Sequence, residues 1–383
     1  MKVNIPDQLK ADVPQTKWGK ILSATPVVMA VVATLLAGLS SSEMTRAQYD
    51  RSLAAQQQSK AGDQWSFFQA KRLRGALQRN SLDLLQSTVE LRPLDAATLK
   101  NSAERLPARL STAETRAKES LQSMAGPDTG AARAPASSRE ALERYLQGSA
   151  QRQSEAAQVR TELLAVLESV AGQQALSLLQ QGQVPGVGVA SAPDLQLKPA
   201  LEAIENLKPE SEIAPLIRAV SDQALDEAFR LALERVQAFD AATRPVNQTI
   251  ERIEELLARQ TACLPPTPVL RASDGFQSGE GGSLSRDFTA ARLRYAAMRY
   301  EVEARLNQSI ANLYELQVRK SNISAERHQN RSQRFFFGML GAQLGVIIAT
   351  LAMAARQRNL LWSLAAAAGL LATAFAIYVY LCV

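Results

Sequence analysis

Two uncharged apolar runs stand almost back to back in this sequence: FFFGMLGAQLGVIIATLAMAA at 335–355 and LLWSLAAAAGLLATAFAIYVYL at 360–381. Only 356–359 separates them, and this short break contains Arg356 and Arg358. Each run has about the 20 residues that a helix needs to cross a hydrocarbon core of about 30 Å. Uncharged runs of that length are typical of membrane spans rather than of helices in a soluble core. The sequence therefore predicts a transmembrane helical hairpin.

A third apolar run covers 21–39 and follows a polar, lysine-containing tail at 1–20. Trp18 stands just before this run, where an aromatic side chain would lie at the level of the lipid headgroups. A cleaved signal peptide is the alternative interpretation, with Ser40 to Ser42 as the small-residue cleavage region. We expect a span, because the run is long and a helical pattern continues directly from it.

The composition of the 383 residues favours helices throughout. Aromatic residues make up only 5%, and no useful stretch alternates apolar and polar residues as a strand would. The net charge is +6, but acids and bases are mixed along the chain, which is typical of solvated helix faces and not of a nucleic-acid partner. We therefore predict an all-α integral membrane protein with three transmembrane helices and a long, coiled-coil-like helical body between the first two.

Prolines and glycines divide the helical body into segments. A stalk helix is expected at 42–91, a single long helix at 138–181, and a second stalk helix at 287–334 that enters the hairpin without a break. Pro245 should separate two further helices. The predicted segments are the tail 1–20, the first span 21–39, the stalk and short helices 40–125, the helical middle region 126–263 with linkers at 126–137 and 182–199, the Pro/Gly-rich loop 264–286, the stalk 287–334, and the spans 335–355 and 360–381.

The two stalk helices both adjoin predicted spans, so they start from the same membrane face. The first carries large apolar or aromatic side chains at helical spacing: Tyr49, Leu53, Trp65, Phe68, Leu73, Leu77, Leu84 and Leu85. Pairing the two stalks is the simplest way to bury such stripes. A rise of about 1.5 Å per residue from each span edge brings Trp65 against Ile310, where we expect it to be buried. Pairing between two subunits is the alternative.

Candidate interaction residues occur in the first stalk. Trp65, Phe68 and Gln69 share one helix face, because they lie three and four positions apart. They form either a recognition surface for an unidentified protein partner or the face that packs on the second stalk.

The spans carry further candidates, because small residues let helix backbones approach closely in lipid. The small residues form two ridges: Gly338, Gly341 and Gly345 in the second span, and Ala368, Ala372 and Ala376 in the third. These ridges predict packing within the hairpin or between the subunits of a homo-oligomer. Gln343 is the strongly polar side chain of the second span, and it would either bond to a neighbouring helix or line a pore.

Catalytic and metal chemistry have few candidates. The single histidine, His328, stands shortly before a span in a polar segment, and Cys263 and Cys382 have neither metal-site spacing nor an obvious disulfide partner. The GEGG stretch at 279–282 lacks the preceding strand and the Lys-Ser/Thr of a phosphate-binding loop. We therefore predict no catalytic, cofactor-binding or metal-binding residue, and no enzyme activity.

Two stretches carry a family resemblance: AGDQWSFFQAK at 61–71, and the ending in which FFF at 335–337 leads into two spans. Both are similar to the bacterial three-pass membrane family known as domain of unknown function 4337, over about 17–90 and 300–383. The departures from that family are Ser66, Phe67-Phe68 and a much longer middle region. The resemblance implies an architecture and no activity, cofactor or catalytic residue.

The expected role is that of a membrane-anchored helical scaffold or assembly protein, with the lipid bilayer, further copies of itself and an unidentified protein as partners. The alternative is an oligomeric channel or a pore-forming, membrane-perturbing effector. The positive-inside rule places 1–20 and 356–359 in the cytoplasm and the helical body outside it, in a bacterial inner membrane.

Overall fold

The computed structural model describes residues 17–123, 136–186, 197–264, 279–354 and 358–382. Every regular element in these residues is a helix, with no strand among them, which confirms the all-α prediction. Three helices contain segments long and apolar enough to cross a membrane, namely Ala24–Thr88, Ser283–Ala352 and Leu360–Leu381. These segments include all of the predicted span 360–381, residues 24–39 of the first predicted span and residues 335–352 of the second.

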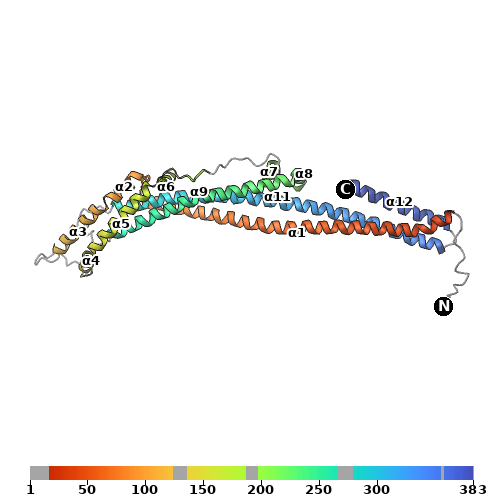
Figure 1. The fold of residues 1–383 in the computed structure, drawn as a ribbon, viewed down its shortest axis with the longest axis horizontal. Helices are drawn as coiled ribbons and strands as arrows, with labels where there is room; N and C mark the ends of the chain where they lie inside the picture. Colours follow the sequence, from red (N-terminus) through yellow and green to blue (C-terminus); the bar gives the residue numbers. More distant parts are fainter. Residues whose placement is uncertain (1–16, 124–135, 187–196, 265–278, 355–357, 383) are drawn as a thin grey trace. The chain divides into compact units, whose positions relative to one another are not determined.

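The helices follow the sequence patterns closely, with several differences in where they break. In chain order they are α1 (Lys17–Thr88), α2 (Ala96–Glu104), α3 (Leu106–Ser123), α4 (Ala136–Gln147), α5 (Ser149–Glu168), α6 (Val170–Gln181), α7 (Lys198–Glu205), α8 (Glu210–Ala219), α9 (Asp222–Cys263), α11 (Gly279–Ala354) and α12 (Arg358–Cys382), as Figure 1 shows.

The chain forms two compact units. The terminal unit comprises 1–62, 194–225 and 312–383, and the middle unit comprises 63–193 and 226–311. Both units contain part of α1 and part of α11, and in each unit these two helices run side by side in opposite directions (Figure 1). Of the two stalk pairings that the sequence allows, the chain itself forms the one within a single subunit.

The second stalk enters the hairpin as one unbroken helix, α11, as predicted. It begins at Gly279, however, so residues 279–286 are helical where the sequence predicts a loop. Glycine lowers helix propensity by about 1 kcal/mol per residue, but burial of a helix face outweighs this cost. Leu284 and Phe288 supply that burial, with exposed fractions of 7% and 1%. Residues 265–278 of the predicted loop lie outside the described residues, as do most of both predicted linkers.

The helices of the middle region break elsewhere than predicted. The single helix expected at 138–181 is three helices, and the break at Ser169 has extended backbone, with φ −64° and ψ 152°. The Ser169 hydroxyl accepts a hydrogen bond from Gly172 N at 3.0 Å, so this serine caps α6. Conversely, Pro245 lies inside the continuous helix α9, where the predicted break is wrong. Burial of Val246 and Ile250 next to it offsets the lost backbone hydrogen bond.

The core of the middle unit combines side chains from α2, α5, α6, α9 and α11. Its central members are Leu99, Leu163, Leu176, Leu179, Ile250, Ile253, Leu256, Phe288 and Tyr295. Ion pairs between helices close the rim of this core, for example Arg292 with Glu254 at 2.8 Å. The Tyr295 side chain is only 2% exposed, and no described residue forms a hydrogen bond with its hydroxyl.

Replacing Tyr295 with phenylalanine is expected to reduce the loss of folding stability at alkaline pH. Burial raises the pKa of Tyr295 to about 12, because the buried site disfavours the phenolate. An unfolded chain ionises this group near its ordinary pKa of about 10, so the free energy of unfolding falls as the pH rises from 10 towards 12. The loss from this tyrosine is about 1.4 kcal/mol at pH 11.

The measurement is the free energy of unfolding of detergent-solubilised wild type and Tyr295→Phe at pH 8 and pH 11. The difference between the two proteins isolates this group from the other tyrosines. Equal losses in both proteins would contradict the prediction.

The buried face of α1 differs from the predicted one. Large side chains of the predicted stripe point to solvent, with Tyr49 66% exposed, Leu73 63%, Leu77 53% and Leu84 67%. In the terminal unit the buried positions of this stalk are instead Gln57 and three alanines spaced seven residues apart: Ala47, Ala54 and Ala61. A seven-residue repeat keeps one narrow seam facing the partner along two long helices. Small side chains in that seam let the backbones approach, so the large ones are left outside.

Candidate functional site

The three predicted spans pack together inside the terminal unit around a methionine. Met29 of α1 is 4% exposed and belongs to a cluster with Leu36, Phe335, Ala342 and other apolar residues. Its thioether occupies the space that side chains would fill at Gly345 of α11 and Gly369 of α12, because a Cβ atom at either glycine would overlap it. The notch formed by these two glycines therefore seats α1 against the hairpin.

The small-residue ridges contribute to this packing in different ways. A Cβ at Gly341 would touch Ala372 Cβ at 4.0 Å, and one at Gly345 would touch Ala368 Cβ at 3.6 Å, so both face α12. A Cβ at Gly338 would meet Leu36 of α1 at 3.5 Å. Ala376 is partly buried against the same cluster. The ridges thus meet within one chain, and they hold the first span as well as the hairpin.

Adding one methyl group at Gly345 is expected to destabilise this packing by about 1 kcal/mol, because Gly345→Ala must displace Met29. In a Met29→Ala background the same substitution fills vacated space, so the loss should vanish or reverse. SDS titrations measure the free energy of unfolding of wild type, Gly345→Ala, Met29→Ala and the double variant. Gly38→Ala is the matched control, since a Cβ there meets nothing within 4 Å. Additive effects of the two substitutions would contradict the notch.

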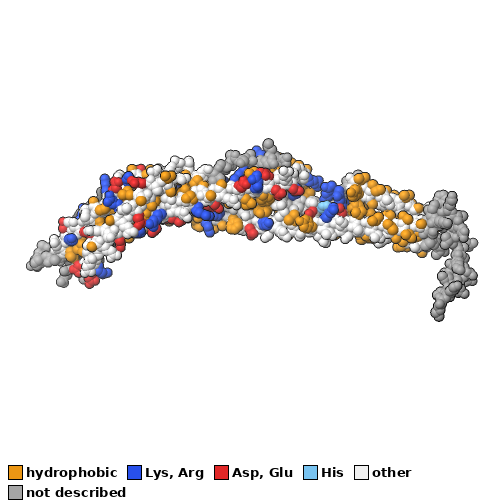
Figure 2. All heavy atoms as spheres, viewed as in Figure 1, with side chains coloured by type: hydrophobic (Ala, Val, Ile, Leu, Met, Phe, Trp, Pro, Cys, Tyr) orange, Lys and Arg blue, Asp and Glu red, His pale blue; other side chains and the backbone are white. Residues whose placement is uncertain are grey.

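The outer surface of the predicted spans is apolar. Exposed side chains include Val27 and Val31 on α1, Leu344 on α11 and Leu371 on α12. Figure 2 shows this surface as a region nearly free of charged side chains, bordered by a group of Lys and Arg. Gln343 is also exposed there, so it faces away from the three-helix packing instead of into it.

A row of polar contacts joins α1 to α11 beyond the predicted spans. We call it the polar seam, and its members are Ser40, Glu43, Asp50 and Gln57 on α1 with Ser332, His328, Ser324 and Ser321 on α11. Ser40 and Ser332 are 8% and 3% exposed, and each hydroxyl donates to the other residue's carbonyl, at 3.0 and 2.8 Å. Both serines are therefore satisfied without water.

The next contacts of the polar seam follow in order. His328 Nδ1 lies 2.5 Å from Glu43 Oε2, and His328 Nε2 lies 4.0 Å from Asp50 Oδ2. Ser324 donates to Asp50 at 2.7 Å, and Ser321 donates to Gln57 at 3.2 Å. Polar groups in a buried helix seam specify one register, because a shift of one helix along the other breaks all the bonds together. Sequence reasoning missed this seam, although the seven-residue spacing of Glu43, Asp50 and Gln57 was visible.

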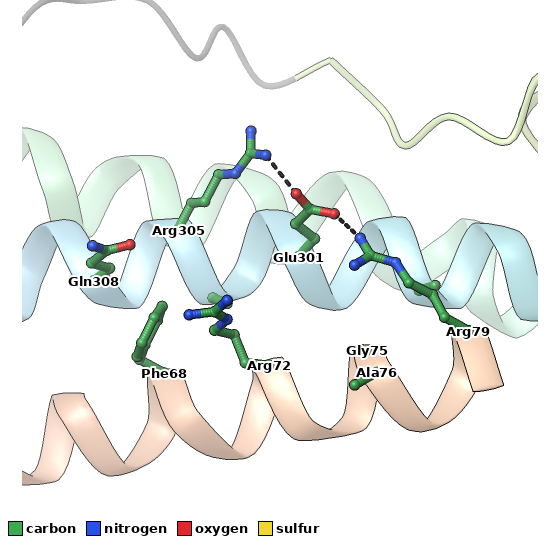
Figure 3. Close-up of a pocket in the computed structure, with 10 residues that line it drawn as sticks. Phe68, Arg72, Gly75, Ala76, Arg79, Glu301, Arg305 and Gln308 are labelled. Carbon is green, nitrogen blue, oxygen red and sulfur yellow. Dashed lines mark hydrogen bonds and ion pairs between the residues drawn. The ribbon is translucent and has the colours of Figure 1, made fainter.

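In the middle unit, α1 and α11 border a groove of about 380 Å³. Figure 3 shows Phe68 and Arg72 of α1 pointing towards α11, with Glu301 and Arg305 above them. Glu301 accepts from Arg79 and from Arg305, the latter at 2.5 Å. The Arg72 guanidinium carbon lies 5.6 Å from the centre of the Phe68 ring.

The three predicted interaction residues of the first stalk, Trp65, Phe68 and Gln69, have different positions at this groove. Phe68 lines it, whereas Trp65 packs edge-on against Phe68 with ring centres 5.4 Å apart. Trp65 is only partly buried, so the expectation that it is a buried aromatic anchor is wrong. Gln69 is exposed. The seven-residue spacing explains the difference. Phe68 lies seven residues after Ala61 and so continues the spacing of the buried alanines, whereas Trp65 and Gln69 do not.

The groove offers binding chemistry rather than proton transfer. Arginine keeps its charge at ordinary pH, and both oxygens of Glu301 are already engaged by arginines. An excess of positive charge beside one aromatic ring suits an anionic group. Arg79, Glu301 and Arg305 were missed from the sequence, because the pairing of Arg79 with Glu301 joins residues 222 positions apart.

The sequence of the first stalk has a counterpart among known protein families. Residues 18–125 match the family model called Domain of unknown function (DUF4337). The resemblance is therefore confirmed for this part of the chain, which includes the AGDQWSFFQAK stretch. The C-terminal ending, on which the resemblance also rests, lies outside the matched residues. No curated protein and no solved structure matches the chain.

The DUF4337 match covers all α1 residues of the polar seam and all α1 residues of the groove. It ends near the end of α3, before the partner residues on α11. Among the described residues, no group of three or more His, Cys, Asp or Glu side chains is placed to hold a metal ion. Cys263 is buried, and desolvation raises the pKa of its thiol.

Proposed function

We propose that this protein is a membrane-anchored helical scaffold or assembly protein without catalytic activity. The observation that carries this proposal is the polar seam, in which buried and partly buried side chains from two distant parts of the chain fix the register of α1 against α11. Such a device gives a rigid, coiled-coil-like stalk a defined length above the spans. A rigid stalk of this kind is suited to holding other molecules in position, as a scaffold does, and it does not by itself supply a catalytic site.

Membrane anchoring is supported by the apolar outer surface of three adjacent helices. Because the spans number three, the tail 1–20 and the break 356–359 lie on one side and the helical body on the other. The short break contains Arg356 and Arg358, and short loops follow the positive-inside rule more strictly than long domains do. We therefore place these two segments in the cytoplasm and the body outside it, in a bacterial inner membrane, the setting implied by the family resemblance.

Cysteine labelling of intact cells tests this topology. With Cys263 and Cys382 replaced by alanine, a cysteine at Gln357 should resist a membrane-impermeant maleimide, and a cysteine at Gly279, where α11 begins, should react. Labelling of position 357 alone from outside would reverse the assignment.

The scaffold proposal is tested by comparing the wild-type chain with a variant whose polar seam is broken, Gln57→Leu with Ser321→Leu. Both should float with liposomes, but proteins cross-linked to the wild-type body in cells should be reduced or lost with the variant. An Ala55→Ser substitution on the exposed side of α1 serves as the control. An identical set of cross-linked proteins in all three, or none with the wild type, would count against a scaffold.

A channel is the second candidate, and the outward position of Gln343 favours it, because a side chain lining an oligomeric pore must be exposed in a single chain. Purified protein in liposomes decides between them. Ion flux that disappears with Gln343→Leu would support the pore, whereas the scaffold predicts flux no greater than in protein-free liposomes.

A further inference from the structure

Gln343 stands near the middle of the second predicted span. It is eight positions after Phe335 and twelve before Ala355, which places it about 12 and 18 Å from the two ends of the run. Its side chain is exposed, and no described residue forms a hydrogen bond with its amide. Its depth leaves the amide far from the headgroups at either end.

An amide group in hydrocarbon needs a partner. The side chain carries two N–H donors and one carbonyl acceptor, and lipid tails satisfy none of them. Leaving such a group without hydrogen bonds costs several kcal/mol. A glutamine is also too short to reach the headgroups from this depth. The exposed amide therefore indicates a contact that a single chain does not supply.

Four hydroxyl side chains of the predicted spans differ from Gln343. The hydroxyls of Thr34, Thr350, Ser363 and Thr373 each donate to a carbonyl of their own helix, at 2.8–2.9 Å. These residues need no partner outside their helix. Among the described span residues with strongly polar side chains, Gln343 is thus the one whose hydrogen bonding is left open.

The residues around Gln343 form a continuous exposed face of α11. Phe336 is 46% exposed, Leu340 39% and Ile347 53%, and they lie at spacings of three and four residues from their neighbours on this face. The opposite face carries Gly338 and Gly345, which pack on α1 and α12. The face with Gln343 therefore remains available while the three spans stay packed.

We propose that this face is the contact between two copies of the chain in the bilayer, with Gln343 of one copy bonded to Gln343 of the other. The inference rests on the proposed membrane function. A glutamine amide both donates and accepts, so it is complementary to itself. Two copies inserted in the same direction around a two-fold axis along the membrane normal bring the same residue to the same depth. Phe336, Leu340 and Ile347 would then pack on their equivalents and exclude lipid from the paired amides.

The affinity of this contact is measured by resonance energy transfer between labelled full-length chains in liposomes, over a range of protein-to-lipid ratios. Gln343→Leu keeps the size and the apolar packing but removes the amide. A hydrogen bond between spans contributes on the order of 0.6–2 kcal/mol, so association should weaken about 3- to 30-fold. Ser363→Ala is the matched control, because its hydroxyl bonds only to its own helix, and association should be unchanged.

The position of the contact is tested by disulfide trapping in the chain with Cys263 and Cys382 replaced by alanine. A cysteine at Leu340 or Ile347 should link two copies, whereas one at Leu364 on α12 should not. Equal association of wild type and Gln343→Leu, or links formed equally well from position 364, would overturn the proposal. Ion flux that depends on Gln343 would also overturn the proposal, because it would show that this face lines a pore. Failure of the wild-type chain to float with liposomes would instead reject the membrane function itself.

Discussion

Replacing Phe288 with alanine is expected to lower the free energy of unfolding by about 3–5 kcal/mol. Phe288 is 1% exposed in the core of the middle unit, among Leu99, Ile253 and Leu256. Removing the ring leaves a cavity that side chains from several different helices line, and they cannot all move to fill it. The cost therefore includes both the lost burial and the cavity.

Chemical denaturation of the detergent-solubilised protein, followed by circular dichroism, measures this loss. Trp65→Ala is the comparison, since it removes an even larger side chain from a position that is only partly buried. We expect a smaller loss at Trp65 than at Phe288. The reverse order would mean that the stalk, and not the helical core of the middle unit, contributes most to stability.

Replacing the buried Ala54 of the stalk with leucine is expected to lower the free energy of unfolding more than the same replacement at the exposed Ala55. Ala54 is 4% exposed, and it lies between Asp50 and Gln57, whose side chains bond to Ser324 and Ser321 of α11. Ala54→Leu must push the helices apart at this point. Overpacking of this kind costs about 1–3 kcal/mol. It also stretches the hydrogen bonds on both sides.

Ala55→Leu is the control, because Ala55 is the next residue along the helix and is exposed. Leucine and alanine have similar helix propensities, so the stability of this variant should stay within about 0.5 kcal/mol of wild type. The free energy of unfolding of the two variants gives the test. Equal losses would show that the two helices are not in close contact at Ala54, and a loss only at Ala55 would place the seam on the other face.

The sequence by itself determined the features that depend on local pattern. The helical fold, the three apolar segments and the unbroken course of α11 from residue 287 through the second predicted span follow from run length, propensity and the absence of strong helix breakers. The DUF4337 resemblance of the first stalk was also visible, because it depends on adjacent residues. None of these features needs knowledge of what a helix packs against.

Only the tertiary structure decided which faces are buried. Hydrophobicity alone favoured Leu73 and Leu77 for the stalk seam, but the close approach of two long helices selects Ala54, Gln57 and their seven-residue repeats instead. The pairing of Ser40 with Ser332 joins residues 292 positions apart, and no local pattern specifies it. The outward position of Gln343 follows in the same way, because the glycines on the opposite side of α11 are taken by Met29 and α12. Side-chain size and hydrogen bonding at a contact surface depend on both partners, so they become readable only once the two helices lie together.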